Sequence, residues 1–264
     1  MAPATASIWL RRYASPAPPR ARLLCLPHAG GSATFFHSWG GALGDDVEVL
    51  TARYPGRQER IGETPMTSIE ELADGLAAEL PPYLDAPLAL FGHSMGASVA
   101  YEIAHRLEAH HGTAAALLMV SCRKPPHLVA PRGRWLRAAA DGRVPAGFRP
   151  GTDAELVDEV LRLGGTDAAL LDDDGMRDLL LPQIRADFEA VDRYTSRPGA
   201  PLGCPVVGYL GVDDPGLTGE DVAEWSSVAP KGFDLKALPG GHFYLTDQRD
   251  ALLEDIRTRL ERVR

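Results

Sequence analysis

This chain of 264 residues has little cysteine, no long apolar run and no excess of basic charge, and each lack excludes a class of protein. Its three cysteines, Cys25, Cys122 and Cys204, are odd in number and lie far apart in or beside apolar segments, which excludes a disulfide framework and a zinc site. We therefore expect a reduced, cytoplasmic compartment. The net charge of -9 and the lack of a basic run argue against a nucleic-acid partner.

Targeting and membrane segments are also missing from the sequence. The stretch before Arg22 is rich in alanine and proline and has no apolar core of the length that a secretory signal needs. No other segment is apolar over enough residues to predict a membrane span. With 45% hydrophobic and 24% charged residues, the chain has the composition of one well-buried domain with room for an insertion.

Short apolar segments alternate with helical patterns along most of the chain. Several of these segments are apolar throughout, which is typical of parallel strands that are buried on both faces. The alternation predicts an α/β fold in which helices cover both faces of a mostly parallel sheet. The predicted strands are residues 7–13, 22–26, 47–52, 88–91, 115–121, 205–210 and 233–238.

The alternation stops after residue 122, and residues 123–196 show helical patterns without a strand pattern. Such a stretch is long for a connection inside a compact domain, so we predict an inserted helical lid, here called the lid segment (residues 123–196). The core would then consist of residues 1–122 and 197–264. Pro182 predicts a break or kink in the second helix of the lid. An apolar stripe that would line a substrate chamber, pack the lid onto the sheet or do both consists of Leu156, Val160, Leu179, Ile184 and Phe188.

The strongest chemical signal is the motif Gly-x-Ser-x-Gly centred on Ser94. It follows a buried strand pattern and opens a helical one, and this order of strand, turn and helix is that of a nucleophile elbow. On so tight a turn the serine projects its Oγ above the sheet, and Gly92 and Gly96 are expected because a Cβ at either place would collide with a neighbouring element. Ser94 is therefore the candidate nucleophile.

An oxyanion hole is expected beside this serine. The loop that follows the strand at 22–26 is rich in small residues, so its backbone N–H groups can approach a ligand. In a serine hydrolase of the α/β type, one N–H of this loop acts with the N–H of the residue after the nucleophile. These donors would be Ala29 and Met95. Taken alone, the loop is also compatible with a plain turn between a strand and a helix.

A serine nucleophile needs a base, and the base needs an acid that orients it. In this fold the chain order is serine, acid, histidine, and the loops after the last two predicted strands supply Asp214 and His242. Since ligands of open α/β sheets bind at the carboxyl ends of the strands, all three side chains would meet there. Asp213 stays open as an alternative acid, although the proline after Asp214 favours Asp214.

The motifs together resemble those of the type II thioesterases that accompany polyketide synthases and nonribosomal peptide synthetases. The resemblance runs from about residue 20 to the C-terminus and implies an α/β-hydrolase fold with a Ser94, Asp214 and His242 triad. It also implies hydrolysis of acyl groups from the phosphopantetheine thiol of a carrier protein, with no metal and no cofactor. The motifs that carry it are Leu26-Pro-His-Ala-Gly-Gly31, Tyr54-Pro-Gly-Arg57-Gln-Glu-Arg60, Gly92-His-Ser-Met-Gly96, Leu181-Pro-Gln-Ile-Arg-Ala-Asp-Phe188, the Asp214-Pro turn with Trp225, and Gly240-Gly-His-Phe243.

The carrier protein would be a transient partner of a monomeric enzyme. Carrier proteins of this kind are usually acidic and this chain is acidic too, so recognition is expected to use a local basic patch and not the net charge. The candidates for this patch are Arg57, Arg60, Arg123, Lys124, Arg132 and Arg134.

Two other functions remain open at this point. One is a lipase or esterase that acts on free small esters, because the residues alone predict only a lidded serine hydrolase for acyl compounds. The other is a catalytically silent module that binds carrier proteins, against which the complete triad argues. The acyl chain, the pathway and the choice between polyketide and peptide carriers are not legible in the sequence.

Overall fold

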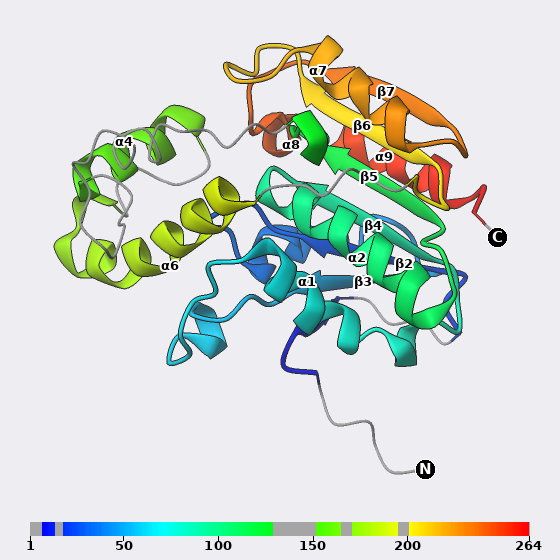
Figure 1. Ribbon diagram of the computed structural model, residues 1–264, viewed down its shortest axis with the longest axis horizontal. Coiled ribbons are helices and arrows are strands. Elements are labelled where there is room, and N and C mark those ends of the chain that lie inside the picture. The colour runs from blue at the N-terminus through cyan, green and yellow to red at the C-terminus, as the bar shows by residue number, and fades with distance from the viewer. Residues whose placement is uncertain (1–6, 14–17, 129–151, 165–170, 195–200, 264) are drawn as a thin grey trace.

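One seven-stranded sheet forms the centre of the protein, in the order β1-β3-β2-β4-β5-β6-β7. The computed structural model describes residues 7–13, 18–128, 152–164, 171–194 and 201–263 (Figure 1). β1 pairs antiparallel with β3, and the other pairings of this sheet are parallel. The strands are β1 (Leu10–Tyr13), β2 (Ala21–Leu26), β3 (Val47–Ala52), β4 (Leu88–His93), β5 (Leu117–Ser121), β6 (Val206–Gly211) and β7 (Phe233–Leu238).

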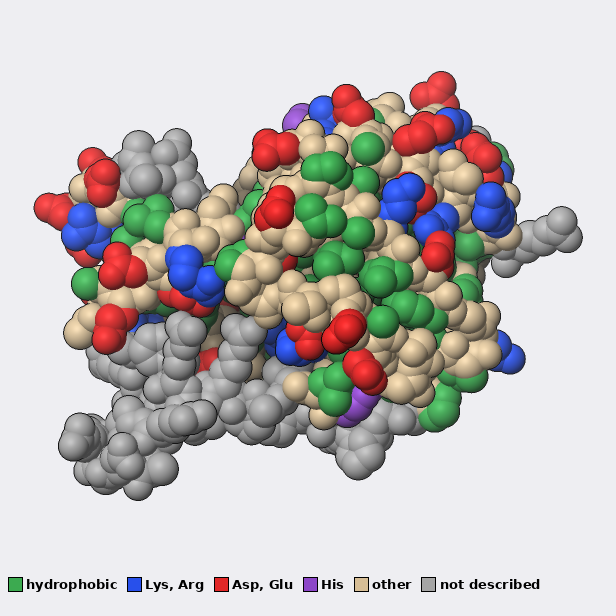
Figure 2. All heavy atoms as spheres, turned by 90° about the horizontal axis from the view of Figure 1, so that it is seen from above, with side chains coloured by type: hydrophobic (Ala, Val, Ile, Leu, Met, Phe, Trp, Pro, Cys, Tyr) green, Lys and Arg blue, Asp and Glu red, His purple; other side chains and the backbone are tan. Residues whose placement is uncertain are grey.

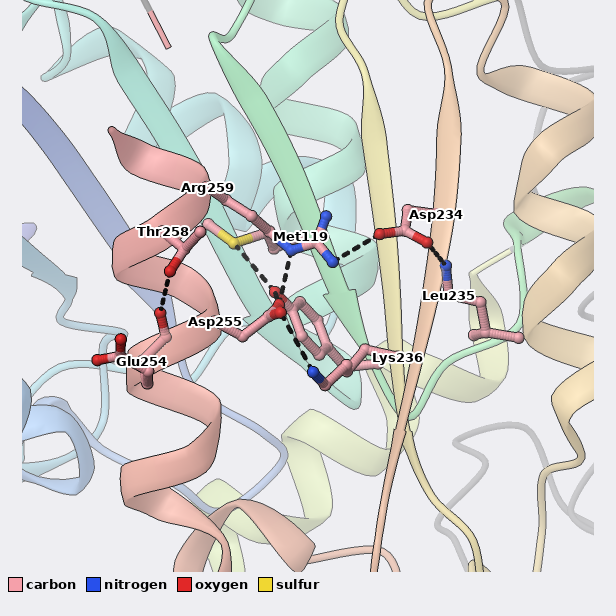
Figure 3. Close-up of polar contacts among 9 residues, drawn as sticks. Met119, Asp234, Leu235, Lys236, Glu254, Asp255, Thr258 and Arg259 are labelled. Atoms are coloured by element: carbon pink, nitrogen blue, oxygen red, sulfur yellow. Dashed lines mark hydrogen bonds and ion pairs between the residues drawn. The ribbon is translucent and has the colours of Figure 1, made fainter. Parts of the chain in front are cut away.

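Helices cover both faces of the sheet, which confirms the predicted α/β class. Helices α1 and α2 pack against each other, and α2 lies on β4 and β5. Helix α9 lies on the opposite face from α2 (Figures 1 and 3). The helices are α1 (Ile69–Ala78), α2 (Met95–His111), α4 (Asp153–Leu163), α6 (Asp174–Arg193), α7 (Gly219–Ala223), α8 (Tyr244–Asp247) and α9 (Arg249–Leu260). Short 3-10 helices are η1 (Ala33–Trp39), η2 (Gln58–Arg60), η3 (Pro81–Tyr83), η4 (Pro126–Leu128) and η5 (Glu224–Val228).

The central strands are buried along their whole length. Every residue of β2, β3, β4, β5 and β6 is buried, as expected for mostly apolar parallel strands. The buried charges Arg22 of β2 and Glu48 of β3 pair with each other at 2.6 Å. Each fully buried leucine side chain in such a sheet stabilises the fold by about 2 kcal/mol relative to exposure. Among the described helices, no sequence is both long and apolar enough to cross a membrane.

The edge strand β7 is only partly buried, and two ion pairs join it to α9 (Figure 3). Asp255 of α9 pairs with Lys236 of β7 at 3.4 Å, and it also accepts hydrogen bonds from Tyr209 Oη of β6 at 2.7 Å and from Arg259 Nε at 2.6 Å. Arg259 also donates through Nη2 to Asp234 Oδ2 of β7 at 2.6 Å. These contacts fix the strand whose carboxyl end leads to His242.

Helices α4 and α6 belong to the lid segment and lie together beyond one end of the sheet, at the left of Figure 1. A capping box in which Thr152 and Glu155 exchange hydrogen bonds begins α4. Helix α6 continues through Pro182 from Asp174 to Arg193, so the predicted break does not occur. The boundaries 123 and 196 stay a prediction, because residues on either side of α4 and α6 lie outside the described ranges.

The apolar stripe of the lid segment forms a small core of its own between α4 and α6. Leu156, Val160 and Ile184 are buried in this cluster, and Phe188 packs against it. The expectation for Leu179 is wrong, because its side chain is 49% exposed. With a side chain every 100° around the helix, Leu179 falls outside the stripe that faces α4.

Candidate active site

The turn at Ser94 has the strained backbone of a nucleophile elbow. Ser94 has φ 53° and ψ -117°, a conformation that non-glycine residues rarely adopt. A Cβ on Gly92 would lie 2.2 Å from the carbonyl oxygen of Gly96, and a Cβ on Gly96 would lie 2.0 Å from that of Leu26. Glycine is therefore required at Gly92 for α2 to approach β4, and at Gly96 for α2 to approach the end of β2, this closely. Met95 is the first residue of α2, where backbone N–H groups have no partner within the helix.

Ser94, His242 and Asp214 lie in one hydrogen-bonded line. The distance from Ser94 Oγ to His242 Nε2 is 3.0 Å, and that from His242 Nδ1 to Asp214 Oδ2 is 2.6 Å. Asp214 Oδ1 also accepts from the backbone N–H of Gly216 at 2.9 Å. Asp213, the alternative acid, is exposed. Asp214, which the following proline favoured as the acid, is thus the aspartate that is hydrogen-bonded to His242.

Close packing of two loops brings the acid to the histidine. The loops follow β6 and β7, which are neighbours in the sheet. A Cβ on Gly211 would lie 2.1 Å from the carbonyl oxygen of Gly241, so only glycine allows this approach. The backbone N–H of Asp213 donates to the carbonyl of Gly240 at 2.9 Å, which locks the two loops together.

The electrostatics around the triad favour an ionised Asp214 and neutral His28 and His93. Burial raises the pKa of Asp214, but the hydrogen bond and charge interaction with His242 outweigh it and hold that pKa below its ordinary value. Burial, together with His242 and Arg57, lowers the pKa of His28 to about 3. Burial and the neighbouring His242 and His28 likewise hold the pKa of His93 well below its ordinary value. An ionised Asp214 accepts from Nδ1–H of His242, which leaves Nε2 free to accept from Ser94 Oγ–H.

The loop that carries Ala29 is a tight turn closed by a hydrogen bond from Gly31 N–H to the carbonyl of His28 at 2.9 Å. Gly30 has φ +76°, the value that a type II turn requires at its third residue. The imidazole of His28 packs so closely on Gly31 that a Cβ there would lie 2.8 Å from His28 Cε1. Glycine at both positions therefore sets the path of the backbone on which the candidate oxyanion donor lies.

Arg57 and Arg60 were candidates for the basic docking patch, and this expectation is wrong because both side chains are buried. The Arg57 side chain is 4% exposed and forms a bidentate ion pair with Asp187 of α6, with Nη2 to Oδ1 at 2.7 Å. Arg60 is buried, donates to the carbonyl of Arg53 at 2.7 Å and stacks over Trp9. Guanidinium groups with their donors used inside the protein are not available to a partner.

Of the other predicted docking residues, Arg123 and Lys124 lie where the lid segment leaves β5. Arg123 is half-buried and donates through Nε to Ser98 Oγ at 2.9 Å. Lys124 is half-buried and pairs with Asp221 at 2.6 Å. Arg132 and Arg134 lie outside the described residues.

Cys122 is the neighbour of the triad that could contribute to a metal site. Its Sγ and the ligand atoms of Asp214 and His242 lie within 4.8 Å of one another, the one such group of three among the described residues. Burial and the nearby Asp214 carboxylate raise the pKa of the Cys122 thiol, which keeps it protonated. Metals bind the thiolate form of cysteine, whereas the Cys122 thiol is protonated, and Asp214 and His242 are already hydrogen-bonded to each other. We therefore interpret these three side chains as a hydrogen-bonded set and not as a metal site.

Sequence reasoning gave no role to Asp187, although the residue lies in one of the quoted motifs. Its carboxylate is 1% exposed and accepts from the backbone N–H of Gly30 at 2.7 Å. An aspartate on a helix is usually a solvated residue, so its type and spacing carried no signal. The pairing with Arg57 spans 130 positions of the sequence and becomes visible only in three dimensions.

This chain is similar in sequence and in structure to known thioesterases. The family described as thioesterase domain matches residues 21–260. Thioesterase PikA5 of Streptomyces venezuelae is 42% identical over 255 residues, which are 96% of this chain and 85% of that protein. The solved type II thioesterase BorB from the borrelidin biosynthetic cluster is 40% identical with a TM-score of 0.81, over 97% of this chain and 99% of that chain. RedJ, a thioesterase from the prodiginine biosynthetic pathway in Streptomyces coelicolor, is 37% identical with a TM-score of 0.79, over 93% of this chain and 87% of that chain.

Proposed function

This chain belongs to the thioesterase domain family, and from that premise we propose that it hydrolyses acyl groups from the phosphopantetheine thiol of carrier proteins. Its similarity to type II thioesterases supports a role in clearing blocked or misloaded modules of a polyketide or nonribosomal peptide synthase. A hydrolase of this kind needs no cofactor, and the phosphopantetheine arm comes with the substrate.

The observation that carries the proposal is the line of hydrogen bonds from Ser94 Oγ through His242 to Asp214. Ser94 Oγ attacks the thioester carbonyl while His242 Nε2 takes the serine proton, and the N–H groups of Ala29 and Met95 bind the oxyanion. Collapse of the tetrahedral intermediate breaks the carbon–sulfur bond, and the leaving thiolate takes its proton from His242. Water then attacks the acyl-enzyme by the same route and releases the acid.

The position of helix α6 of the lid segment supports the proposal that the acyl group is delivered on the long phosphopantetheine arm. Helix α6 reaches the oxyanion loop through Asp187 and Ile184, so it borders the loop that carries the expected oxyanion donor Ala29. We assign to it one wall of the acyl chamber, lined by residues among Leu156, Val160, Ile184 and Phe188. A narrow entrance beside this wall would admit the arm and exclude much of the bulk water.

Recognition of the carrier protein is assigned to a local patch. On the face shown in Figure 2, the described acidic and basic side chains are interspersed. The chain as a whole is acidic, with a net charge of -9. The proposed patch is the exit of the lid segment from β5, with Arg123 and Lys124 and, beyond the described residues, Arg132 and Arg134. Contacts of this kind steer an acidic partner and raise the association rate more than the affinity.

Mass spectrometry of acyl-carrier proteins tests the proposal directly. A panel of carrier proteins with different acyl groups is incubated with the enzyme, and the loss of each acyl group is compared with hydrolysis of the same group on coenzyme A and on a simple alcohol. We expect the carrier-bound thioesters to be cleaved with the largest kcat/KM, and the Ser94→Ala variant to leave all of them intact.

Three outcomes would contradict the proposal. Preference for the alcohol esters would identify a lipase or esterase. Intact substrates of every kind, together with no labelling of Ser94 by a fluorophosphonate, would identify a silent binding module. Labelling of Ser94 without hydrolysis of any acyl-carrier protein would still indicate a serine hydrolase but would contradict the carrier protein as its partner.

A further inference from the structure

Asp187 is a buried carboxylate that the proposed mechanism does not use. It comes from α6 of the lid segment, yet its partners belong to the core. Oδ2 accepts from Gly30 N–H at 2.7 Å and from Arg57 Nη1 at 2.8 Å, and Oδ1 accepts from Arg57 Nη2 at 2.7 Å. A carboxylate that accepts three charge-assisted hydrogen bonds from one loop and one arginine fixes both in a defined geometry.

Arg57 completes the same arrangement from the other side of the loop. It follows β3, and its Nη1 donates to the carbonyl of Gly31 at 2.8 Å as well as to Asp187. Burial lowers the pKa of Arg57, but the charge and hydrogen bonds of Asp187 outweigh it and hold that pKa above its ordinary value. The guanidinium is therefore a permanent charge in a site without water access, and it depends on Asp187 for compensation.

These bonds fall on the two residues that follow the oxyanion donor Ala29. The N–H of Gly30 and the carbonyl of Gly31 are held by Asp187 and Arg57, respectively. Ile184, one turn before Asp187 on α6, lies so close to Gly30 that an added Cβ would be 3.0 Å from its Cγ1. Helix α6 thus contacts the turn through one polar and one apolar side chain.

We infer that Asp187 and Arg57 are positioning residues that hold the oxyanion loop, so that the lid helix α6 sets the geometry in which Ala29 N–H meets the developing charge. An oxyanion donor contributes only if it lies at hydrogen-bond distance from the oxygen in the transition state, and a displacement of about 1 Å costs up to roughly 100-fold in rate. The inference rests on the proposed acyl-enzyme function for the identity of the loop, but it does not depend on a carrier protein.

The test measures kcat, KM and inhibition in the full-length enzyme with a short-chain thioester that lacks a carrier. Rates are expressed per serine that a fluorophosphonate labels at completion, so that unfolded molecules do not count. In Asp187→Asn the amide keeps one acceptor but loses the charge that holds Arg57. We expect kcat to fall about 10- to 100-fold while KM changes less than about threefold.

A transition-state mimic supplies a readout that a purely structural role would not change. A trifluoromethyl ketone with the same acyl chain adds to Ser94 and places its oxyanion in the hole. Its inhibition constant is expected to rise by the same factor as kcat/KM falls, because both depend on the oxyanion donors. The matched control is Asp153→Asn, which removes an ion pair between α4 and Arg185 of α6 on the outside of the lid segment and is expected to leave kcat and inhibition unchanged.

A second variant covers the case in which Asp187→Asn does not fold. Arg57→Lys keeps a buried cation beside Asp187 but cannot bond Gly31 and both carboxylate oxygens at once. It is expected to lower kcat and weaken the ketone in the same proportion, by about tenfold. Combined with Asp187→Asn, it should add little, since the two residues act as one unit.

The inference is overturned if kcat per labelled serine and ketone inhibition stay at wild-type values in both variants while only the melting temperature falls. A rise in KM alone would also overturn it and would place the pair in substrate binding. If the wild-type enzyme cleaves neither the small thioester nor a carrier-bound one and Ser94 is not labelled, it is the proposed function that fails.

Discussion

The two sides of Ser94 are built in different ways. On the sheet side, Asp214 and His242 stand on loops that follow adjacent parallel strands, and the strand order alone brings them together. On the lid side, Asp187 reaches the oxyanion loop from a helix that packs mainly in a small core of its own. The sheet side therefore gets its geometry from backbone topology, and the lid side gets it from one buried ion pair.

Removal of the nucleophile or the base tests the sheet side most strongly. Ser94→Ala and His242→Ala are each expected to lower kcat by on the order of 10⁴-fold, because neither group works without the other. For the same reason the double variant should lose little more than either single one. Steady-state kinetics with a small thioester measures all three, and additive losses in the double variant would argue against a shared unit.

The acid is tested next, by paired substitutions at neighbouring positions. Asp214→Asn should lower kcat by roughly 10³-fold, because the amide favours the imidazole tautomer that cannot accept the serine proton. Asp213→Asn should change kcat little, since its side chain is exposed. A larger loss of kcat in Asp213→Asn would identify Asp213 as the acid that orients His242, and equal losses would contradict the assignment to Asp214 alone.

The two regions should also differ in how they unfold. Leu90→Ala in β4 removes a fully buried side chain of the main core and should lower the global free energy of unfolding by about 3 kcal/mol. Leu156→Ala removes an equally buried side chain from the lid cluster. Its effect is expected to be local, with faster amide exchange in α4 and α6 and unchanged exchange in β4. Amide hydrogen exchange with mass spectrometry measures both, and a matching loss of protection in β4 would show one cooperative unit.

The smallest effect concerns pH and the buried histidine beside the oxyanion loop. The pKa of His28 is about 3 in the folded protein and about 6.5 when unfolded, so the unfolded chain binds a proton that the folded one excludes. Stability from this group is full above pH 6.5 and falls as the pH drops toward 3. Between pH 7.5 and 5 the loss should be roughly 2 kcal/mol.

Urea unfolding at the two pH values measures this difference. His28→Phe should reduce the loss of stability on acidification by about the stated amount, whereas substitution of the exposed His111 by Gln should leave it as in the wild type. An identical pH dependence in His28→Phe would mean that His28 is protonated in the folded state.

Most of the fold was predictable from the sequence because it depends on local patterns. The strands at 47–52 and 233–238 begin and end at the predicted residues, and the caps of α1 and α4 follow from Ser68 and Thr152. The elbow at Ser94 needs two glycines at fixed spacing, and this motif can be identified directly in the sequence. Once the strands are parallel, the loops that carry Asp214 and His242 must lie at the same end of the sheet.

Tertiary structure alone decided what the charged residues do. Arg57 and Arg60 have the composition and turn setting of solvated residues, yet both are buried. Arg57 pairs with Asp187, which lies 130 positions along the chain, and Arg60 stacks over Trp9 while it donates to the carbonyl of Arg53. Leu179 follows an apolar helical pattern and is exposed, since the rotation of α6 against α4 chooses which stripe faces inward. Asp187 is the clearest case. A sequence carries its hydrophobic periods locally, whereas an ion pair between residues 130 positions apart exists only after the chain has folded.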